Sequence, residues 1–432
     1  MLKSIAFIFL SFFVSSAFGQ DLTQLGGDLS TDADGRNALQ LPAPNISSEE
    51  RRLLQLSGFG DFHRIFTKEE GLGPSFVNRS CGGCHVDNGR GPIKFSSDNF
   101  TGSAMIIKVS TKGVNKDGTP KGVPGVGGQI QDHNLSDTPV IRPKITWIRR
   151  TREYPDGTKY SLRRPVVSLK IPKVDMKKVN TSMRMTPAMI GMGLIEEIPE
   201  SAILEKSDPN DSDGDGISGK PNYVADAAKG GKSLGRFGFK ATHPTVEQQS
   251  AAAFFGDMGV TTRLFLTKDK NQEVSDEALS RLVFYLKFGG VPKARNQSDL
   301  FIQSGFRLFK SIGCDSCHRV SFNMGSNNNP EYSDQTIHPF SDFLLHDMGR
   351  ELADNVSQFS ARGSEWRTTP LWGLGFSKSI SDVRQAFLHD GRARNIEEAI
   401  LWHGGESEKS KKKFMNLLSI ERESLIAFLE SL

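Results

Sequence analysis

Cysteine is scarce in this chain, because only four of its 432 residues are cysteines. A large charge excess is also missing, since the formal net charge is +4 at pH 7. Beyond the N-terminus, no apolar run is long enough to cross a bilayer. These shortages leave room for two disulfides at most, and they argue against nucleic-acid binding through net charge and against a transmembrane anchor.

The other bulk properties describe an ordinary globular protein. Hydrophobic residues make up 37% of the chain and charged residues 24%. The length exceeds what a single hydrophobic core usually organises, so we expect two or more domains.

Residues 1–19 have the pattern of a secretion signal. Lys3 supplies a positive charge, residues 5–17 are apolar, and Ser16-Ala17-Phe18-Gly19 places small residues before a cut at Gln20. The apolar stretch is short for a membrane span, and no cysteine follows the cut to carry a lipid anchor. We therefore expect a signal peptide at 1–19 and a mature protein that is exported, into a bacterial periplasm.

All four cysteines lie in two CxxCH motifs, Cys81-Gly82-Gly83-Cys84-His85 and Cys314-Asp315-Ser316-Cys317-His318. Two cysteines at this spacing can form thioethers to the vinyl groups of a haem, and the next histidine can ligate the iron. A redox-active dithiol does not require that histidine, and a zinc site would have to join pairs far apart in the chain. The motifs therefore predict two covalently attached haem c groups, with His85 and His318 as iron ligands.

Further features recur in the same order after each motif, which indicates a duplicated unit. An Arg-x-Thr-Pro element stands at 184–187 and again at 367–370, each followed by Gly-x-Gly. Each half ends in an apolar helical stripe, formed by Leu279, Leu282, Val283 and Leu286 and by Leu425, Ile426, Phe428 and Leu429. We expect a mainly α protein of two cytochrome c-like domains, at residues 20–292 and 293–432.

The first half is longer because of an insertion at about residues 100–175. Met105-Ile106-Ile107-Lys108-Val109 is a β-prone run, and residues 146–148 and 160–162 flank the turn signal Tyr154-Pro155-Asp156-Gly157. We expect a small antiparallel β element with a hairpin at this turn.

An acidic loop at residues 208–222 contains Asp211, Asp213, Asp215 and then Gly216. Oxygen ligands at positions one, three and five with glycine at six match the start of an EF-hand-type calcium loop. The twelfth residue is Asn222 instead of a glutamate, so a calcium site and a solvated acidic loop are both open.

Several short segments are distinctive when they are taken together. They are residues 71–74 (GLGP), 81–92 (CGGCHVDNGRGP), 235–241 (GRFGFKA), 257–261 (DMGVT), 345–349 (LHDMG), 387–393 (FLHDGRA) and 397–400 (EEAI). This set resembles the di-haem oxidoreductase family, which is related to the bacterial dihaem cytochrome c peroxidases. The resemblance implies one reactive haem, at His85, and one electron-relay haem, at His318.

In the related enzymes the C-terminal haem is six-coordinate, with a Met or Tyr on the helix that follows the His-Asp-Gly element. The matching position here is His403, so the resemblance implies two histidine ligands, His318 and His403, on that iron. Met348 is the competing ligand, and a purely structural His403 is the third reading.

The peroxidases also carry a displaceable histidine soon after the first motif, and none occurs here before His133. The resemblance therefore implies an open sixth position at the His85 haem. A glutamine and an acid serve the peroxide in the relatives, and they correspond to Gln248 or Gln249 and to Asp257. Glu196 and Glu197 are alternative acids.

These features predict a haem oxidoreductase with peroxidase-like activity, hydrogen peroxide as the oxidant and a small cytochrome or cupredoxin as the electron donor. A non-catalytic dihaem electron-transfer cytochrome is the alternative, and oxidation of another substrate is a third reading. Phe239 or Trp372 is a candidate aromatic between the haems. The basic cluster at Lys409 and 411–413 is either solvated surface or a docking site for an acidic redox partner.

Overall fold

The computed structural model describes residues 22–32, 34–91, 104–136, 139–378 and 386–432. The predicted signal peptide at 1–19 lies outside the described residues, as does the start of the predicted insertion at residues 100–103. Within the described residues, no helix has the length and apolar character needed to cross a membrane.

The helices are short or medium in length and are distributed over the whole chain. They are α1 (Glu49–His63), α2 (Cys81–Cys84), α3 (Met192–Glu197), α4 (Glu200–Leu204), α5 (Val246–Ala253), α6 (Asp276–Lys287), α7 (Leu300–Ser311), α8 (Ile396–Trp402), α9 (Glu408–Met415) and α10 (Ser419–Ser431). The predicted apolar stripes at the end of each half form α6 and α10, as expected from their helical spacing.

The strands pair two by two and form no larger sheet in the described part of the chain. They are β1 (Ser30–Thr31), β2 (Ser75–Phe76), β3 (Met105–Ser110), β4 (His133–Asn134), β5 (Lys144–Glu153), β6 (Lys159–Ser168), β7 (Asn180–Met185), β8 (Tyr223–Ala225), β9 (Lys232–Leu234), β10 (Val291–Pro292), β11 (Phe322–Asn323), β12 (Thr336–Ile337), β13 (Leu345–Asp347) and β14 (Glu365–Arg367).

The prediction of a mainly α fold with two cytochrome c-like domains is wrong. The structure is 31% helical and 19% strand, so the protein mixes helices with many small sheets. The sequence contains 43 glycines and 20 prolines, which interrupt helices and favour turns. The long connections between the apolar stripes therefore form paired strands and loops instead of further helices.

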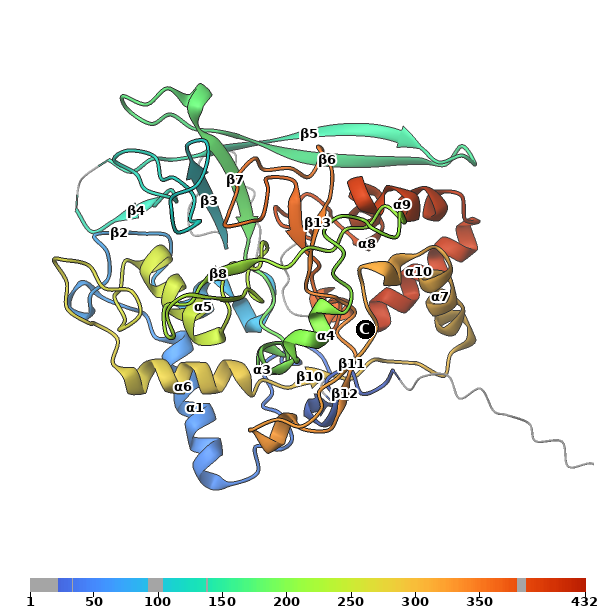
Figure 1. Ribbon diagram of the computed structural model, residues 1–432, viewed down its shortest axis with the longest axis horizontal. Helices are drawn as coiled ribbons and strands as arrows, with labels where there is room; N and C mark the ends of the chain where they lie inside the picture. Colours follow the sequence, from blue (N-terminus) through green and yellow to red (C-terminus); the bar gives the residue numbers. More distant parts are fainter. Residues whose placement is uncertain (1–21, 33, 92–103, 137–138, 379–385) are drawn as a thin grey trace, which may run out of the picture.

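In each half, the helix before the motif packs against the last helix of that half. The α1 helix lies on α6, and α7 lies on α10 (Figure 1). Glycine makes both contacts close. A Cβ atom added to Gly58 would lie 2.2 Å from the carbonyl oxygen of Arg281, and one added to Gly305 would lie 2.1 Å from that of Ser424. The repeated Ser-Gly-Phe sequence before each motif therefore has a packing role.

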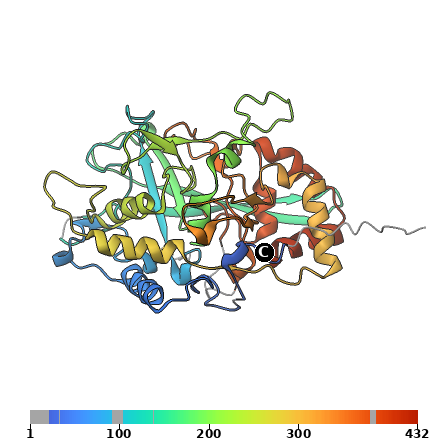
Figure 2. The same cartoon turned by 60° about the horizontal axis from the view of Figure 1, so that its bottom comes forward.

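The hairpin predicted at Tyr154-Pro155-Asp156-Gly157 is confirmed, and it joins two strands of ten residues each, β5 and β6. This ribbon extends from the first half across the C-terminal half, where it lies over α8 and α9 (Figure 1, Figure 2). The Tyr154 hydroxyl donates a hydrogen bond to Glu397 (2.7 Å), and Arg163 Nε donates to the carbonyl oxygen of Arg392 (3.2 Å). The ribbon therefore links the two halves.

The two halves also share one apolar core. The largest cluster of buried hydrophobic residues runs from Leu22 to Leu432 and includes residues of both predicted domains. A smaller cluster lies around β3 and β7. The boundary at residues 292 and 293 stays a prediction.

Candidate functional site

The first CxxCH motif forms the short helix α2, which ends at its histidine. The Ser80 hydroxyl caps this helix by accepting a hydrogen bond from the Gly83 amide (3.0 Å). His85 Nδ1 lies 2.9 Å from the carbonyl oxygen of Pro187, the last residue of the first Arg-x-Thr-Pro element. This contact orients the imidazole and leaves Nε2 for a metal ion. Burial lowers the pKa of His85 to about 4, which favours the neutral, ligating form.

The second motif follows α7 directly and holds its histidine in the same way. His318 Nδ1 lies 2.8 Å from the carbonyl oxygen of Phe340, and burial lowers the pKa of His318 to about 4. The ring of Phe309, from α7, packs 5.7 Å from Phe340 and 5.6 Å from Phe428 of α10. An aromatic shell therefore surrounds this motif and suits the apolar edge of a haem.

The cysteines of both motifs are poorly suited to redox or zinc chemistry. Burial raises the pKa of Cys81, Cys84 and Cys314 to about 12, so these thiols do not ionise readily. Within the described residues, neither cysteine pair belongs to a group of three or more side chains that could hold one metal ion. The environment of the motifs therefore favours haem over the dithiol and zinc alternatives.

The His403 side chain lies opposite His318. Its Nδ1 is 2.7 Å from the carbonyl oxygen of Ala399, one turn earlier in α8, and the two imidazole ring centroids are 6.5 Å apart. An imidazole nitrogen ligates a first-row metal at about 2 Å, so two histidines on opposite sides of one iron place their ring centroids about 6 Å apart. The space between His318 and His403 therefore fits an iron ion.

Asp257, the predicted catalytic acid, lies beside the first motif on the π-helical turn η5 (Phe254–Met258). Its Oδ1 accepts a hydrogen bond from Gln129 Nε2 (2.8 Å), and its carbonyl oxygen accepts one from the Val77 amide (2.7 Å). Burial is the main cause of the raised Cys84 pKa, and the Asp257 charge adds to it, so the carboxylate is close to that thiol. Burial also raises the pKa of Asp257 itself.

A lysine that the sequence did not single out faces the same carboxylate. Lys108 of β3 pairs with Gln129 across an antiparallel bridge, so the two side chains point to the same side. Burial lowers the pKa of Lys108, and the nearby Asp257 charge raises it. Among the described residues the Lys108 ammonium has no hydrogen bond or ion pair. Only the pairing of its strand brings Lys108 to Asp257, and the periodicity of the sequence does not reveal that pairing.

Several buried polar atoms near Asp257 have no partner among the described residues. They are the side-chain oxygens of Gln129, Gln131 and Gln249. Gln249 also contacts His243, whose pKa burial lowers to about 4, with the Lys108 charge lowering it further. Unpaired buried polar atoms are rare in folded proteins, so this cluster has the character of a ligand-binding surface.

The two predicted glutamines have different roles. Gln248 donates to the carbonyl oxygen of Ala225 (2.9 Å) and accepts from the Ala227 amide (2.9 Å), so it fixes a neighbouring loop. Gln249 is the one whose oxygen is unpaired among the described residues and which lies against His243.

At the junction of the two halves, the structure stacks Trp366 on His389, with ring centroids 3.7 Å apart and planes at 10°. Lys240 Nζ lies 4.0 Å from the Trp366 centroid, and Phe239 meets that ring edge-on at 6.4 Å. The other predicted aromatic, Trp372, is buried against Gly191 of the first half, and its place between the haems stays a prediction. Trp366 directly precedes the second Arg-x-Thr-Pro element. Its position next to this repeated element could have identified Trp366 from the sequence.

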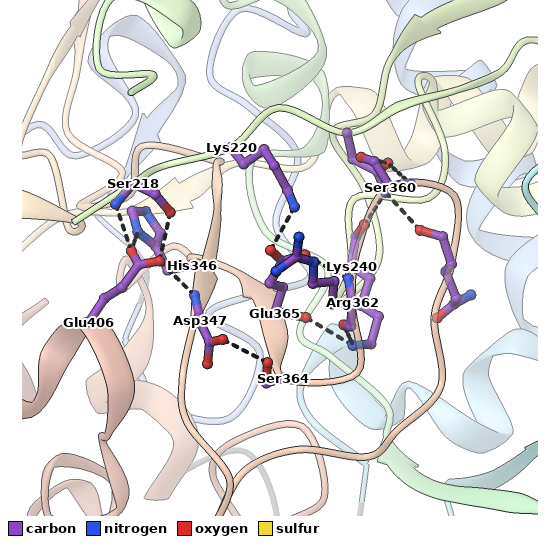
Figure 3. A network of polar contacts seen from close by, with 12 residues as sticks. Ser218, Lys220, Lys240, His346, Asp347, Ser360, Arg362, Ser364, Glu365 and Glu406 are labelled. Atoms are coloured by element: carbon purple, nitrogen blue, oxygen red, sulfur yellow. Dashed lines mark hydrogen bonds and ion pairs between the residues drawn. The ribbon is translucent and has the colours of Figure 1, made fainter. Parts of the chain in front are cut away.

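A polar network joins the second motif to this junction (Figure 3). His346 Nδ1 lies 2.7 Å from Glu406, as Figure 3 shows. The same Nδ1 is 3.5 Å from Cys317 Sγ, and His346 Nε2 lies 2.8 Å from Asp342. Burial opposes the charge on His346, but Asp342 and the other partners raise its pKa well above the ordinary value. Glu406 also accepts from Ser218, so a charged histidine and this carboxylate fix the loops beside Cys317.

The sequence profile of a family described as "Di-haem oxidoreductase, putative peroxidase" matches residues 20–270 and 266–432. The chain belongs to this family. The resemblance predicted from the motifs is thereby confirmed, and membership gives a di-haem protein with an oxidoreductase function. The family description also names a peroxidase activity, without a substrate.

A comparison with curated proteins found no match to this di-haem oxidoreductase. Among solved structures, a chain of "Kuenenia stuttgartiensis Hydrazine Synthase Pressurized with 20 bar Xenon" is similar at 13% identity, with 100% of each chain covered and a TM-score of 0.33. A TM-score this low supports no conclusion about fold or activity.

The alternative acids of this di-haem oxidoreductase are engaged elsewhere. Lys287 Nζ lies 2.9 Å from Glu196 and 3.0 Å from Glu197. Glu196 also accepts from the first amide of α5, at Val246, and Glu197 from Asn327. Both carboxylates therefore stabilise the packing of α3 against α5 and α6.

The acidic loop brings its three aspartates together. One ligand atom from each of Asp211, Asp213 and Asp215 lies within 4.8 Å of the others. Lys409 Nζ donates to the carbonyl oxygen of Asp215 (2.7 Å), so one lysine of the basic cluster contacts this loop. Calcium binding here stays a prediction, as does docking at the basic cluster.

Proposed function

We propose that this di-haem oxidoreductase is an exported c-type enzyme that reduces hydrogen peroxide at the His85 site and relays electrons through the His318 site. The contrast between the two histidines carries the proposal. His403 faces His318, whereas among the described residues only Phe62 is in ring contact with His85. An iron with one protein ligand has a free position for peroxide, and an iron with two does not.

Each haem is held by one motif in this proposal. Cys81 and Cys84 attach the first, and Cys314 and Cys317 attach the second, while His85 and His318 ligate the irons. Bound there, the haems would supply redox-active irons for peroxide reduction and for electron relay. The carbonyl oxygens of Pro187 and Phe340 orient the ligating imidazoles.

Asp257 moves the proton in peroxide reduction. Its carboxylate accepts a proton from one peroxide oxygen and returns it to the other, which prepares that oxygen to leave as water. The raised pKa of Asp257 suits this role, because a carboxylate of higher basicity is a better proton acceptor near neutral pH. The hydrogen bond from Gln129 orients the acceptor oxygen.

Lys108 and Gln249 assist at the same place. The Lys108 ammonium favours the ionised form of Asp257 and can donate to a peroxide oxygen. Gln249 lies against His243, and its side-chain oxygen can accept a hydrogen bond from peroxide.

Electrons enter from a small protein donor, a cytochrome or a cupredoxin. The peroxide-reducing role of the His85 site does not depend on which of the two serves.

The test is an Asp257→Asn variant, which keeps the size of the side chain but removes the proton acceptor. We expect peroxide turnover to fall by about 100-fold or more while haem loading is unchanged. Asp257→Glu is the matched control, because it keeps a carboxylate and should recover part of the activity. Full turnover in Asp257→Asn with normal haem content would assign the proton transfer to another group.

A further inference from the structure

A cavity of about 490 Å³ lies beside the β5–β6 ribbon, and no cysteine of either motif lines it. Its walls come from three places: the ribbon, β7, and two loops of the C-terminal half that include Arg350 and the His-Asp-Gly element. The volume is within the range of small-molecule sites in proteins.

The charged residues around this cavity leave an excess of arginine. Arg392 is paired with Asp390, at 2.7 Å, and Asp354 is paired with Arg184 at 3.0 Å and Lys240 at 3.3 Å. Asp390 and Asp354 are therefore already paired with cations of the protein, and they are not available to pair the remaining arginines of the lining.

Two other arginines remain. Arg164 of β6 has a buried Nε with no hydrogen-bond partner among the described residues, and its guanidinium forms no ion pair with them. The Arg350 guanidinium likewise has no partner in the described part of the chain. Arg150 approaches Glu351 only to 3.8 Å. Within the described residues, Arg164 and Arg350 thus line the cavity without an acid to pair them. For the partly buried Arg164 guanidinium, this is costly unless an anion binds.

The rest of the lining limits the ligand further. Pro165, Val167 and Met183 form a small apolar wall in a mainly polar lining, and this wall can contact the hydrocarbon part of an organic ligand. The imidazole of His389, also in the lining, is stacked on Trp366, and burial lowers its pKa to about 4, so it adds no charge. A free inorganic ion would leave most of this volume and the apolar wall unused.

We propose that this cavity binds a small dicarboxylate, with Arg164 and Arg350 each pairing one carboxylate and the apolar wall contacting the carbon chain. Arginine is suited to this task, because its planar guanidinium binds a carboxylate through two parallel hydrogen bonds. The proposal goes beyond peroxide reduction and does not depend on it.

The test is isothermal titration calorimetry of succinate into the haem-loaded, full-length protein, with acetate as the monocarboxylate comparison. We expect saturable binding of succinate with Kd below about 1 mM and much weaker binding of acetate. Arg164→Gln and, separately, Arg350→Gln should each weaken succinate binding about tenfold or more. Arg350 is exposed, so we expect Arg350→Gln to fold normally. Succinate binding to this variant can therefore be measured even if the Arg164 variant folds poorly.

Arg152→Gln is the matched control, because Arg152 is an exposed arginine of the same ribbon that does not line the cavity. Succinate binding should be unchanged in this variant. Equal weakening in Arg152→Gln would mean diffuse attraction to a basic surface and would overturn the proposal. Absence of saturable binding to the haem-loaded protein would also overturn it, since a haem propionate would then be the carboxylate that occupies these arginines.

Discussion

At the scale of single residues, Asp257 and Lys108 control each other's charge. Burial raises the pKa of Asp257, and the Lys108 charge lowers it. A carboxylate that accepts a proton is active only above its pKa, so activity is lost as the pH falls through that value. The acid limb of the peroxide pH profile should therefore lie above the ordinary aspartate value of about 4.

Replacing Lys108 tests this coupling. Lys108→Gln removes the positive charge, so the pKa of Asp257 rises further and the acid limb moves to higher pH. Lys108→Arg keeps the charge and should leave the limb nearly in place. The measurement is kcat/KM for hydrogen peroxide against pH. If the limb stays where it is in Lys108→Gln, the lysine does not act on Asp257.

The sequence predicted the cysteines and histidines of the two motifs as haem-binding residues, but only part of their surroundings. The two CxxCH motifs could be named because they are short local patterns, and Gln248, Gln249 and Asp257 because the family resemblance implies them. Lys108 and Trp366 could not, because strand pairing and loop packing bring them to the site from distant parts of the chain. Gln248 and Gln249 are adjacent in sequence, and only helix geometry shows which of them holds a loop.

At the scale of secondary structure, two glycines permit the close helix contacts that support the motifs. Gly58→Ala would push a methyl group against the Arg281 carbonyl of α6, and Gly305→Ala against the Ser424 carbonyl of α10. We expect each variant to lose about 1–3 kcal/mol of unfolding free energy, measured by chemical denaturation.

Gly60→Ala is the control for this prediction. It lies in the same helix as Gly58, but a Cβ atom there would have no neighbour within 4 Å among the described residues. Alanine favours helix over glycine by about 1 kcal/mol, so this variant should be neutral or stabilised. If Gly60→Ala lost as much unfolding free energy as Gly58→Ala, the loss could not be due to the close contact between α1 and α6.

Two of the helices and one hairpin were predictable, and the fold class was not. The apolar stripes of α6 and α10 repeat at helical spacing, and the Tyr154-Pro155-Asp156-Gly157 turn is a strong local signal for the β5–β6 hairpin. The β3 run was recognised as β-prone, but its pairing with β7, and that of β13 with β14, joins segments separated in the chain. Because these pairings could not be predicted, the sequence analysis expected more helix and less strand than the protein contains.

At the scale of the whole molecule, the two halves depend on one another. Leu25 of the first half and Leu432 of the second belong to the same buried cluster. The Arg295 amide donates to the carbonyl oxygen of Ser431 (2.8 Å), and the Ala294 amide to that of Thr23 (2.9 Å). The predicted division at residues 292 and 293 therefore crosses a continuous core.

A shared core predicts cooperative unfolding. In calorimetry of the haem-loaded protein, we expect one main transition, with the absorbance of both haems changing at the same temperature. Gly305→Ala should lower that temperature for both haems, although Gly305 lies in the second half. Two transitions well separated in temperature would mean that each half folds independently.

The central claim is that the two haem irons differ in coordination, and electron paramagnetic resonance of the oxidised, fully loaded protein tests it most directly. We predict one high-spin signal, from the His85 haem, and one low-spin signal, from the haem between His318 and His403. The low-spin signal should be lost in His403→Ala. Two low-spin signals in the unmodified protein would contradict this claim and favour a non-catalytic electron carrier.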